Sequence, residues 1–403
     1  MVLQRSTSPI ESVLEHVDAQ GLIDLASGMI RFPSQIPNEG PLGEFLAAEM
    51  RKLGCFDEVM LQPVVPGRAN VIGVVRGSGG GPTVLLNGHM DIPAAMGAWT
   101  RDPYEPSVEG GWLYGLGITD MKAAVACQIK AAEAFARARL SLPGDLVVTA
   151  VIHHNVCGLG TKFFLDSWDR PIHAAINGEP TDLKVQVAHG GAWQFEIVTR
   201  GKAAHNSRQE EGVHAIDKML AILRELDASK LTYDRSRALE GLPRIVVGMI
   251  EGGRSPSRTA DACLVRGDIR ISFGMTQETL KADLQRVIDS VRAHDPGLEA
   301  EVRGLVYQRP FRIDPEAPIV RTVRRAHADV AGSEAVVSAG LPVAGYVTDS
   351  SDLVRAGIPT VVYGPGDWRV DPDERVRVAD LVTATKVYAL AAARFMAEAT
   401  PEA

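Results

Sequence analysis

Two adjacent histidines and an asparagine follow a run of β-forming residues in the stretch VVTAVIHHNVCGLGT. His153, His154 and Asn155 therefore stand at the end of a predicted strand, where α/β sheets gather their active sites. An imidazole can bind a metal or exchange a proton near neutral pH, whereas an amide is a weak and neutral ligand. Adjacent strand residues point to opposite faces, so only one histidine is expected to face a site, and we predict that it is His154.

Three further polar residues stand at the ends of predicted strands or beside a helix. His89 ends the apolar run in LLNGHMD, and Asp91 is spaced to fix the tautomer of a metal-bound imidazole at that position. Asp120 directly precedes a long predicted helix and could be its N-cap, and Glu179 in INGEPT could be a solvated loop carboxylate. Together, however, one imidazole and two carboxylates at such positions predict a site for Zn²⁺, Mn²⁺ or Co²⁺.

The elements that must position these residues alternate between strands and helices. Helix-spaced apolar residues fill 10–54, and the next segments predict two strands, a helix and a strand, at 69–77, 82–91, 119–139 and 144–154. Strands that alternate with crossover helices form a sheet covered by helices on both faces. We therefore expect an α/β domain with a doubly wound mixed sheet.

Beyond Val187 the pattern changes to strand, helix, strand, strand and helix, at 191–201, 212–226, 243–253, 262–274 and 277–294. This order is typical of a ferredoxin-like (α+β) sandwich. The α/β pattern resumes near Tyr307. The sequence thus predicts a catalytic domain formed by 1–187 and 306–403 and interrupted by an inserted domain at 188–305.

The overall composition argues against several kinds of partner. The 403 residues carry a net charge of -8 and no Lys/Arg cluster with interleaved aromatics, which argues against nucleic acid or an anionic membrane. No apolar run reaches the ~20 residues that span a bilayer, and the first residues lack the pattern of a signal peptide. The 4 cysteines are widely spaced, which is typical of reduced thiols. We therefore expect a cytoplasmic protein that acts on a small molecule.

The longest motif, GHMDIPAAMGAWTRDPYEPSVEGGWLYGLGITDMKAA, strongly resembles the signature of the aminoacylase, carboxypeptidase and acetylornithine deacetylase family of metallohydrolases. Further matches follow in order along nearly the whole chain: NGEPT, GKAAHNSRQEEGVHAI, GDIR, TDSSDLVRAGIP and YGPG. The resemblance implies a zinc-peptidase-like domain with an inserted lid domain. It also implies a homodimer formed through the lid, which could assemble into a higher homo-oligomer.

Members of this family normally bind two metal ions. Carried over by motif, His89 and Glu179 would bind the first ion, Asp120 would bridge both, and Asp91 would orient the histidine. The second ion needs a Glu from an Asp-Glu-Glu motif and a His shortly after the GPG turn. In this chain the motif position is His-His-Asn, and no histidine follows the turn. The resemblance therefore implies one labile divalent ion per chain, which would be Mn, Zn or Co.

The general base of the family is replaced as well. His154 occupies the position of the catalytic Glu and is expected to accept the proton from the attacking water, with His153 as a second candidate. The alternative is that His154 only fills space in a relative that has lost catalysis and serves in ligand binding or assembly. His205 in GKAAHNS resembles the lid histidine that polarises the scissile carbonyl in a partner subunit's active site.

Four residues are candidates for binding the substrate: Asn155, Arg258, Arg270 and Arg309. Arginine binds a carboxylate through two parallel hydrogen bonds, so we expect a small carboxylate-bearing substrate whose C–N bond is hydrolysed. Loss of the second ion favours a substrate that stores developing charge within itself. The leading hypothesis is an aminohydrolase that releases ammonia from an electron-poor aromatic amine such as 5-nitroanthranilate. The alternative enzyme is an N-acyl amino acid amidohydrolase or a dipeptidase.

Overall fold

The computed structural model describes residues 10–340, 345–368 and 372–398. The described residues divide into two compact units, with His189–Pro310 and 345–347 in unit 2 and the remainder in unit 1. The predicted insertion, 188–305, stops inside the last strand of unit 2, which ends at Gln308.

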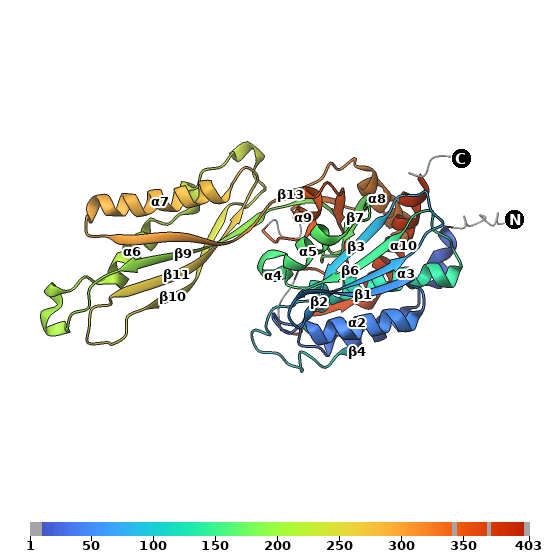
Figure 1. The fold of residues 1–403 in the computed structure, drawn as a ribbon, viewed down its shortest axis with the longest axis horizontal. Coiled ribbons are helices and arrows are strands. Elements are labelled where there is room, and N and C mark those ends of the chain that lie inside the picture. Colours follow the sequence, from blue (N-terminus) through green and yellow to red (C-terminus); the bar gives the residue numbers. More distant parts are fainter. Residues whose placement is uncertain (1–9, 341–344, 369–371, 399–403) are drawn as a thin grey trace. The chain divides into compact units, whose positions relative to one another are not determined.

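Unit 1 is built on a nine-stranded mixed sheet (Figure 1). Its strands lie in the order β1-β2-β6-β3-β7-β15-β8-β13, with β14 paired to β8. Their bounds are β1 Glu58–Val65, β2 Arg68–Val75, β3 Val84–His89, β6 Leu146–Val151, β7 Ala174–Asn177, β8 Val185–His189, β13 Phe311–Arg312, β14 Val337–Ala339 and β15 Thr360–Val362. A second sheet in this unit has the order β16-β5-β4, with bounds Arg375–Arg377, Trp112–Tyr114 and Ser107–Glu109.

Helices cover both faces of the large sheet because its strands are apolar on both sides. In β3, for example, Val84 and Leu86 belong to one core and Leu85 to the other. The helices of the first core are α1 Ala19–Ile30, α2 Gly40–Leu53, α3 Ala123–Ala138, α8 Pro318–Ala331 and α10 Val378–Glu398, with the short η1 Glu11–His16. Those of the second core are α5 Leu159–Ser167 and α9 Ser350–Arg355. This is the doubly wound α/β arrangement that the alternating pattern predicted.

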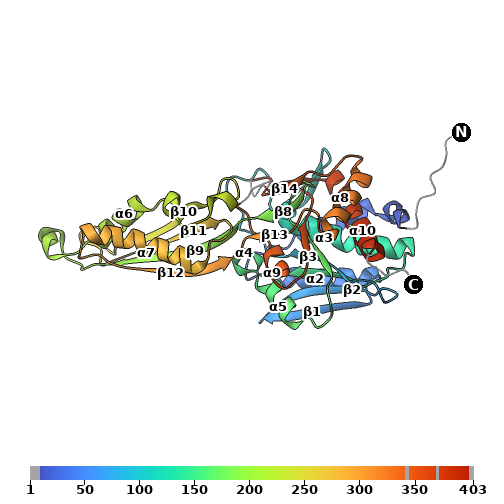
Figure 2. The same cartoon turned by 90° about the horizontal axis from the view of Figure 1, so that it is seen from above.

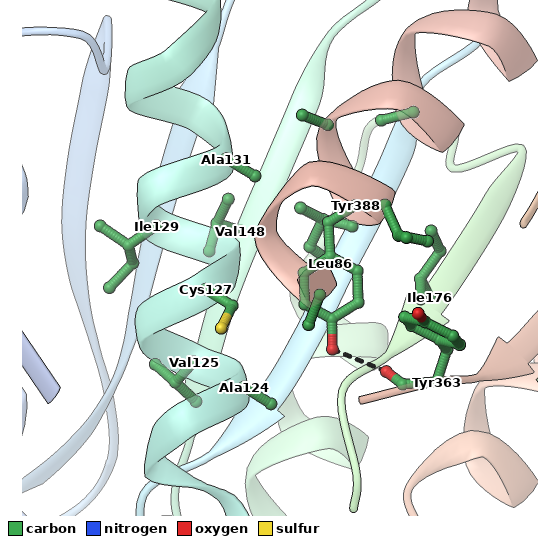
Figure 3. Packing of buried hydrophobic residues seen from close by; sticks show 14 of the residues in the cluster. Leu86, Ala124, Val125, Cys127, Ile129, Ala131, Val148, Ile176, Tyr363 and Tyr388 are labelled. Atoms are coloured by element: carbon green, nitrogen blue, oxygen red, sulfur yellow. Dashed lines mark hydrogen bonds between the residues drawn. The ribbon is translucent and has the colours of Figure 1, made fainter. Parts of the chain in front are cut away.

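Helix α3 forms the centre of the first core. It lies beside α10 (Figure 2), and its short alanine side chains allow close packing against both that helix and the sheet. Figure 3 shows Ala124, Cys127 and Ala131 of α3 in this core, and the Tyr388 hydroxyl donating a hydrogen bond of 2.6 Å to the Tyr363 carbonyl. The loop that precedes α3 is thereby joined to a rigid element.

The central strands β6, β3 and β7 are parallel, so their carboxyl ends meet at one edge of the sheet. His89 at the end of β3 pairs in register with Val151 at the end of β6. On the other side of β3, Asn87 pairs with Asn177 at the end of β7. The residues that follow these three strands are therefore brought close together.

Unit 2 has the β-α-β-β-α-β order of a ferredoxin-like fold. Its strands are β9 Gly191–Arg200, β10 Arg244–Gly252, β11 Ala262–Ile271 and β12 Glu299–Gln308, and its long helices are α6 Ala215–Glu225 and α7 Gln277–His294. The strands pair antiparallel in the order β10-β11-β9-β12, and α7 runs lengthwise along the sheet (Figure 1). Trp193, Phe195 and Ile197 point from β9 into a separate core of this unit.

Among the described residues, none of the helices is both long and apolar enough to cross a bilayer. The cysteines at 55, 127, 157 and 263 are free thiols. The cytoplasmic location inferred from the sequence stays a prediction.

Candidate metal centre

Three predicted ligands lie together at the carboxyl edge of β6, β3 and β7. His89 Nε2 is 3.2 Å from Asp120 Oδ1 and 3.7 Å from Glu179 Oε1. His89 ends β3, Glu179 lies just beyond β7, and Asp120 lies in η2 (Ile118–Lys122), the irregular turn before α3. Asp120 does not cap that helix, because Lys122 is its N-cap residue and the helix has no side-chain capping bond.

The facing atoms of these side chains are buried and lack hydrogen-bond partners. Within the described residues, no hydrogen bond reaches His89 Nε2, Asp120 Oδ1 or either carboxylate oxygen of Glu179. Burying such groups without partners is costly, and a bound cation removes that cost. Ligand atoms at about 2.0–2.2 Å from one ion lie roughly 3–4 Å from each other, which matches the observed separations. An imidazole with two carboxylates therefore fits a divalent transition metal.

His154 is the fourth side chain at this cluster. Its ring stacks on that of His89, with centroids 4.3 Å apart and planes inclined by 10°. Its Nε2 atom lies 3.8 Å from Glu179 Oε1. One ligand atom from each of these three residues lies within 4.8 Å of the other two. The ring is therefore placed either to bind an ion or to exchange a proton with a molecule held there.

Burial and charge oppose one another at this cluster. Burial and the neighbouring His154 ring disfavour a charge on His89, but the surrounding carboxylates, Asp120 foremost, outweigh them and raise its pKa to about 9. Burial also raises the pKa of Glu179 to about 7. The two histidines act to lower this pKa, whereas the nearby carboxylates act with burial to raise it. Such crowding of buried carboxylates is what a cation site requires.

Asp91 contacts His89 as predicted, but through its main-chain carbonyl and not its carboxylate. Its carboxylate was expected to orient His89, but the His89 Nδ1 atom lies 2.9 Å from the Asp91 main-chain carbonyl and 3.8 Å from the carboxylate. The carboxylate instead accepts 2.8 Å hydrogen bonds from the backbone N–H groups of His154 and Asn155. The reason is local geometry, because these two N–H groups begin the short helix α4 (His154–Cys157) and have no acceptor within it. Asp91 thus holds the turn that carries His154.

The side chains of His153 and Asn155 make hydrogen bonds to residues other than the three predicted ligands. His153 has a left-handed backbone (φ 60°), its Nδ1 atom lies 3.0 Å from Arg68 Nη2, and its N–H group points to Glu39. The Asn155 amide donates to the Asp91 carboxylate at 2.9 Å. The catalytic role suggested for His153 and the substrate role suggested for Asn155 stay predictions.

Sequence reasoning assigned no role to Asp349, which lies in the motif TDSSDLVRAGIP. Its Oδ1 atom is 2.8 Å from His154 Nδ1, and its Oδ2 atom accepts a 2.7 Å hydrogen bond from the Thr161 hydroxyl. Burial would raise the pKa of Asp349, but the charge and hydrogen bond of His154 prevail and lower it to about 2. In the sequence Asp349 appeared only as part of this family motif, which does not say what its side chain contacts.

Glu374 is a second residue that the sequence did not reveal. Its carboxylate is buried and accepts hydrogen bonds from the Gly117 N–H group at 2.8 Å and from the Thr119 N–H group and hydroxyl at 2.7 and 2.5 Å. Burial raises its pKa to about 7 in spite of these bonds. It lies in the DERV segment, which follows the GPG turn where the family has a metal-binding histidine and this sequence has none. Glu374 fixes the turn that immediately precedes Asp120.

Replacing Glu374 with glutamine is expected to weaken metal binding without removing any ligand. An amide offers one oxygen where the carboxylate uses two, so at least one buried N–H group of the turn loses its acceptor. Since groups that support metal ligands typically contribute 10–100-fold to affinity, we expect the Zn²⁺ dissociation constant from chelator competition to rise by about that factor. Asp373→Asn is the matched control, because Asp373 binds the exposed Thr100. An unchanged constant in Glu374→Gln would contradict this role.

The remaining predicted residues belong to unit 2. His205 is exposed and accepts a hydrogen bond from the Ser207 N–H group, and its backbone pairs with that of Arg258, which is also exposed. Arg270 contacts the Asp268 carboxylate at 2.8 Å and donates to the Gly345 carbonyl at 3.0 Å. Arg309 is exposed on the segment that leaves β12. The roles inferred for these residues stay predictions.

Comparison with known proteins agrees with this geometry. The family description "Peptidase family M20/M25/M40" matches residues 85–394. The N-formyl-4-amino-5-aminomethyl-2-methylpyrimidine deformylase of Halalkalibacterium halodurans is 27% identical, over 94% of this chain and 96% of the relative. Acetylornithine deacetylase of Proteus mirabilis is 30% identical, over 83% and 84%. The solved structure of the di-peptidase Dug1p from Saccharomyces cerevisiae superposes with a TM-score of 0.81 at 14% identity, covering 98% of this chain and 99% of the other.

An α/β fold whose mixed sheet carries a buried imidazole–carboxylate cluster at its carboxyl edge defines a metal-dependent hydrolase of the metallopeptidase type. The chain belongs to peptidase family M20/M25/M40, and it is a hydrolase of carbon–nitrogen bonds. The resemblance first seen in its motifs is confirmed, as is the α/β fold class.

Proposed function

We propose that this protein hydrolyses the amide bond of a small N-acylated amine and does so with a single divalent cation. The observation that carries the proposal is the set of buried, unpartnered atoms contributed by His89, Asp120 and Glu179. The names of two relatives support the choice of bond, because one is a deformylase and the other a deacetylase of an amine. N-Formyl and N-acetyl amines are therefore the first substrates to test.

We propose one ion because this chain lacks the residues with which the family binds the second ion. One of those residues is replaced by Asn155, whose amide is already bound to Asp91, and the sequence has no histidine after the GPG turn. A neutral amide also lacks the charge that a carboxylate would contribute. Mn²⁺, Zn²⁺ and Co²⁺ all suit the remaining donors, and the small number of ligands favours a labile ion.

The residues of the chain divide the work as follows. His89, Asp120 and Glu179 would hold the cation, which when bound polarises a carbonyl group and lowers the pKa of a water molecule. His154 Nε2 faces this position and is placed to accept the proton that a water molecule loses and to deliver it to the leaving nitrogen. Asp91 keeps the His154 turn in place through backbone hydrogen bonds.

We also propose a role for unit 2. Its antiparallel sheet and exposed His205 fit a lid through which two chains associate as a homodimer. Arg258, Arg270 and Arg309 stay candidates for binding a substrate carboxylate. The oligomeric state can be measured directly by light scattering.

The relatives named above favour an amide as the substrate in place of an aromatic amine. That earlier hypothesis rested on the missing second ion alone. It is therefore included in the following test only as an alternative arm.

The experiment combines elemental analysis with a substrate screen. After loading with Mn²⁺ or Zn²⁺, we expect about one ion per chain and release of formate or acetate from N-formyl or N-acetyl amines. Two tightly held ions would contradict the single-ion proposal. Ammonia release from 5-nitroanthranilate, without amide hydrolysis, would replace the proposed substrate class.

A further inference from the structure

The His154 ring is held on the side that faces away from the metal cluster. Asp349 Oδ1 lies 2.8 Å from its Nδ1 atom, and the second oxygen of the same carboxylate accepts from the Thr161 hydroxyl at 2.7 Å. All three side chains are buried, and each comes from a different element, namely α4, α5 and the residue before α9. The ring is thus fixed from a direction that leaves Nε2 directed toward Glu179.

The Asp349 carboxylate is not used for an ordinary structural purpose. Asp349 is the N-cap residue of α9, a position at which an aspartate side chain usually accepts from the first turn of the helix. In the described part of the chain, however, its side chain makes no capping bond to α9. Both carboxylate oxygens are directed to His154 and Thr161 instead, in a site where an unpaired charge would be costly.

We infer that Asp349, supported by Thr161, is the positioning residue that makes His154 a usable replacement for the family's carboxylate base. An ionised carboxylate can only accept hydrogen bonds, so the atom facing it, Nδ1, must carry the proton. With the Nδ1 proton held by Asp349, the other ring nitrogen, Nε2, is the atom that faces the cluster. An unrestrained imidazole would divide between two tautomers and several orientations, and would accept a proton at this place less often.

This inference deepens the proposed function and rests on it for the kinetic part alone. The positioning itself can be observed without turnover. Zn²⁺ is diamagnetic, so the Zn²⁺-loaded full-length protein labelled with ¹⁵N-histidine permits NMR detection of ring N–H groups among the 10 histidines of the chain. We expect one strongly downfield Nδ1–H signal from His154, identified by its absence in His154→Gln.

The test compares Asp349→Ala with Asp352→Ala. Asp352 lies in α9, the helix that Asp349 precedes, and contacts Lys162 and Arg355 rather than His154. Its replacement therefore controls for loss of a carboxylate at this place. Asp349→Ala is expected to lose the downfield signal and to lower kcat about 10²-fold with KM changed less than about threefold, because orientation of a catalytic histidine acts mainly on the chemical step. Asp352→Ala should keep both the signal and kcat.

A milder variant keeps the inference testable if Asp349→Ala does not fold. Thr161→Val keeps the shape of the side chain and removes only the hydroxyl donor, so we expect the signal to persist with a shifted position and kcat to fall by less than in Asp349→Ala. Circular dichroism and thermal melting verify that each variant is folded. Persistence of the original signal in folded Asp349→Ala, or equal loss of kcat in Asp352→Ala, would overturn the inference. If the unmodified protein hydrolyses no amide while the signal behaves as expected, the proposed function fails and the positioning stands.

Discussion

Replacement of Asp120 with asparagine is expected to abolish metal binding and to reduce hydrolysis by at least about 10³-fold. The substitution keeps the shape of the side chain but removes the charge of one of the two carboxylates that lie within 4 Å of His89 Nε2 among the described residues. Stabilisation by the cation is worth several kcal/mol, and each 1.36 kcal/mol corresponds to about tenfold in rate. Elemental analysis and kcat/KM against the substrate identified in the screen measure the two effects.

Thermal melting provides a readout that is independent of turnover. A ligand at 100 times its dissociation constant stabilises the folded state by about 2.7 kcal/mol, which for a domain of this size is roughly 5 °C or more. Zn²⁺ should raise the Tm of the unmodified protein by about that amount and leave the Tm of Asp120→Asn unchanged. Asp166→Asn, at an exposed position in α5, should respond like the unmodified protein. A full Zn²⁺ response in Asp120→Asn would mean that the ion binds elsewhere.

Replacement of His154 with glutamine is expected to lower kcat by about 10²–10⁴-fold while the protein still binds one ion. Glutamine can donate to Asp349 through its amide but has no atom that accepts and releases a proton near neutral pH. The experiment therefore distinguishes two roles of His154. It is the base if the variant loses kcat and keeps the ion, and a metal ligand, which its distance from Glu179 also permits, if the variant loses both. Metal content and kcat are measured on the same preparations.

His173→Gln is the control for that experiment. His173 is exposed and immediately precedes β7, whose opposite end leads to Glu179, so its loss should change neither quantity. If His154→Gln loses the ion together with activity, His154 is a ligand and the proton acceptor must be sought among the carboxylates. If it keeps full activity, the ring has no part in catalysis.

The alternation of strands and helices was sufficient to predict the class of the fold, because the buried strands β2, β3 and β6 and the helix α3 are each visible as an apolar segment of the sequence. Strand β1 was not predicted. It contains Pro63, which disfavours a central strand, and the structure indeed places β1 at the edge of the sheet with an irregular register at that proline. The ferredoxin-like insertion had a clear pattern, but its final strand, β12, was not predicted, and the predicted boundary at 305 falls inside it.

The candidate site was predicted unevenly for a physical reason. Residues at the ends of parallel strands, such as His89 and Glu179, can be placed near each other from the sequence because the sheet fixes where those ends lie. The contact between Asp349 and His154 joins residues 195 positions apart, and no local pattern records it. The contact between His89 and Asp91 was predicted for the carboxylate and is made by the main-chain carbonyl, because spacing alone does not distinguish these two acceptors of one residue.

The hydrogen bonds that Glu374 accepts from the Gly117–Thr119 turn have a consequence for how the protein is made. The four side chains of the cluster are all synthesised before unit 2, yet Asp349 and Glu374, which hold His154 and the Asp120 turn, follow it in the chain. Domains commonly begin to fold on the ribosome from the N-terminal side. Here the nascent chain must complete unit 2 and return before its metal centre is assembled, so an arrested chain that ends before Glu374 would hold every proposed ligand and still lack the support that positions Asp120.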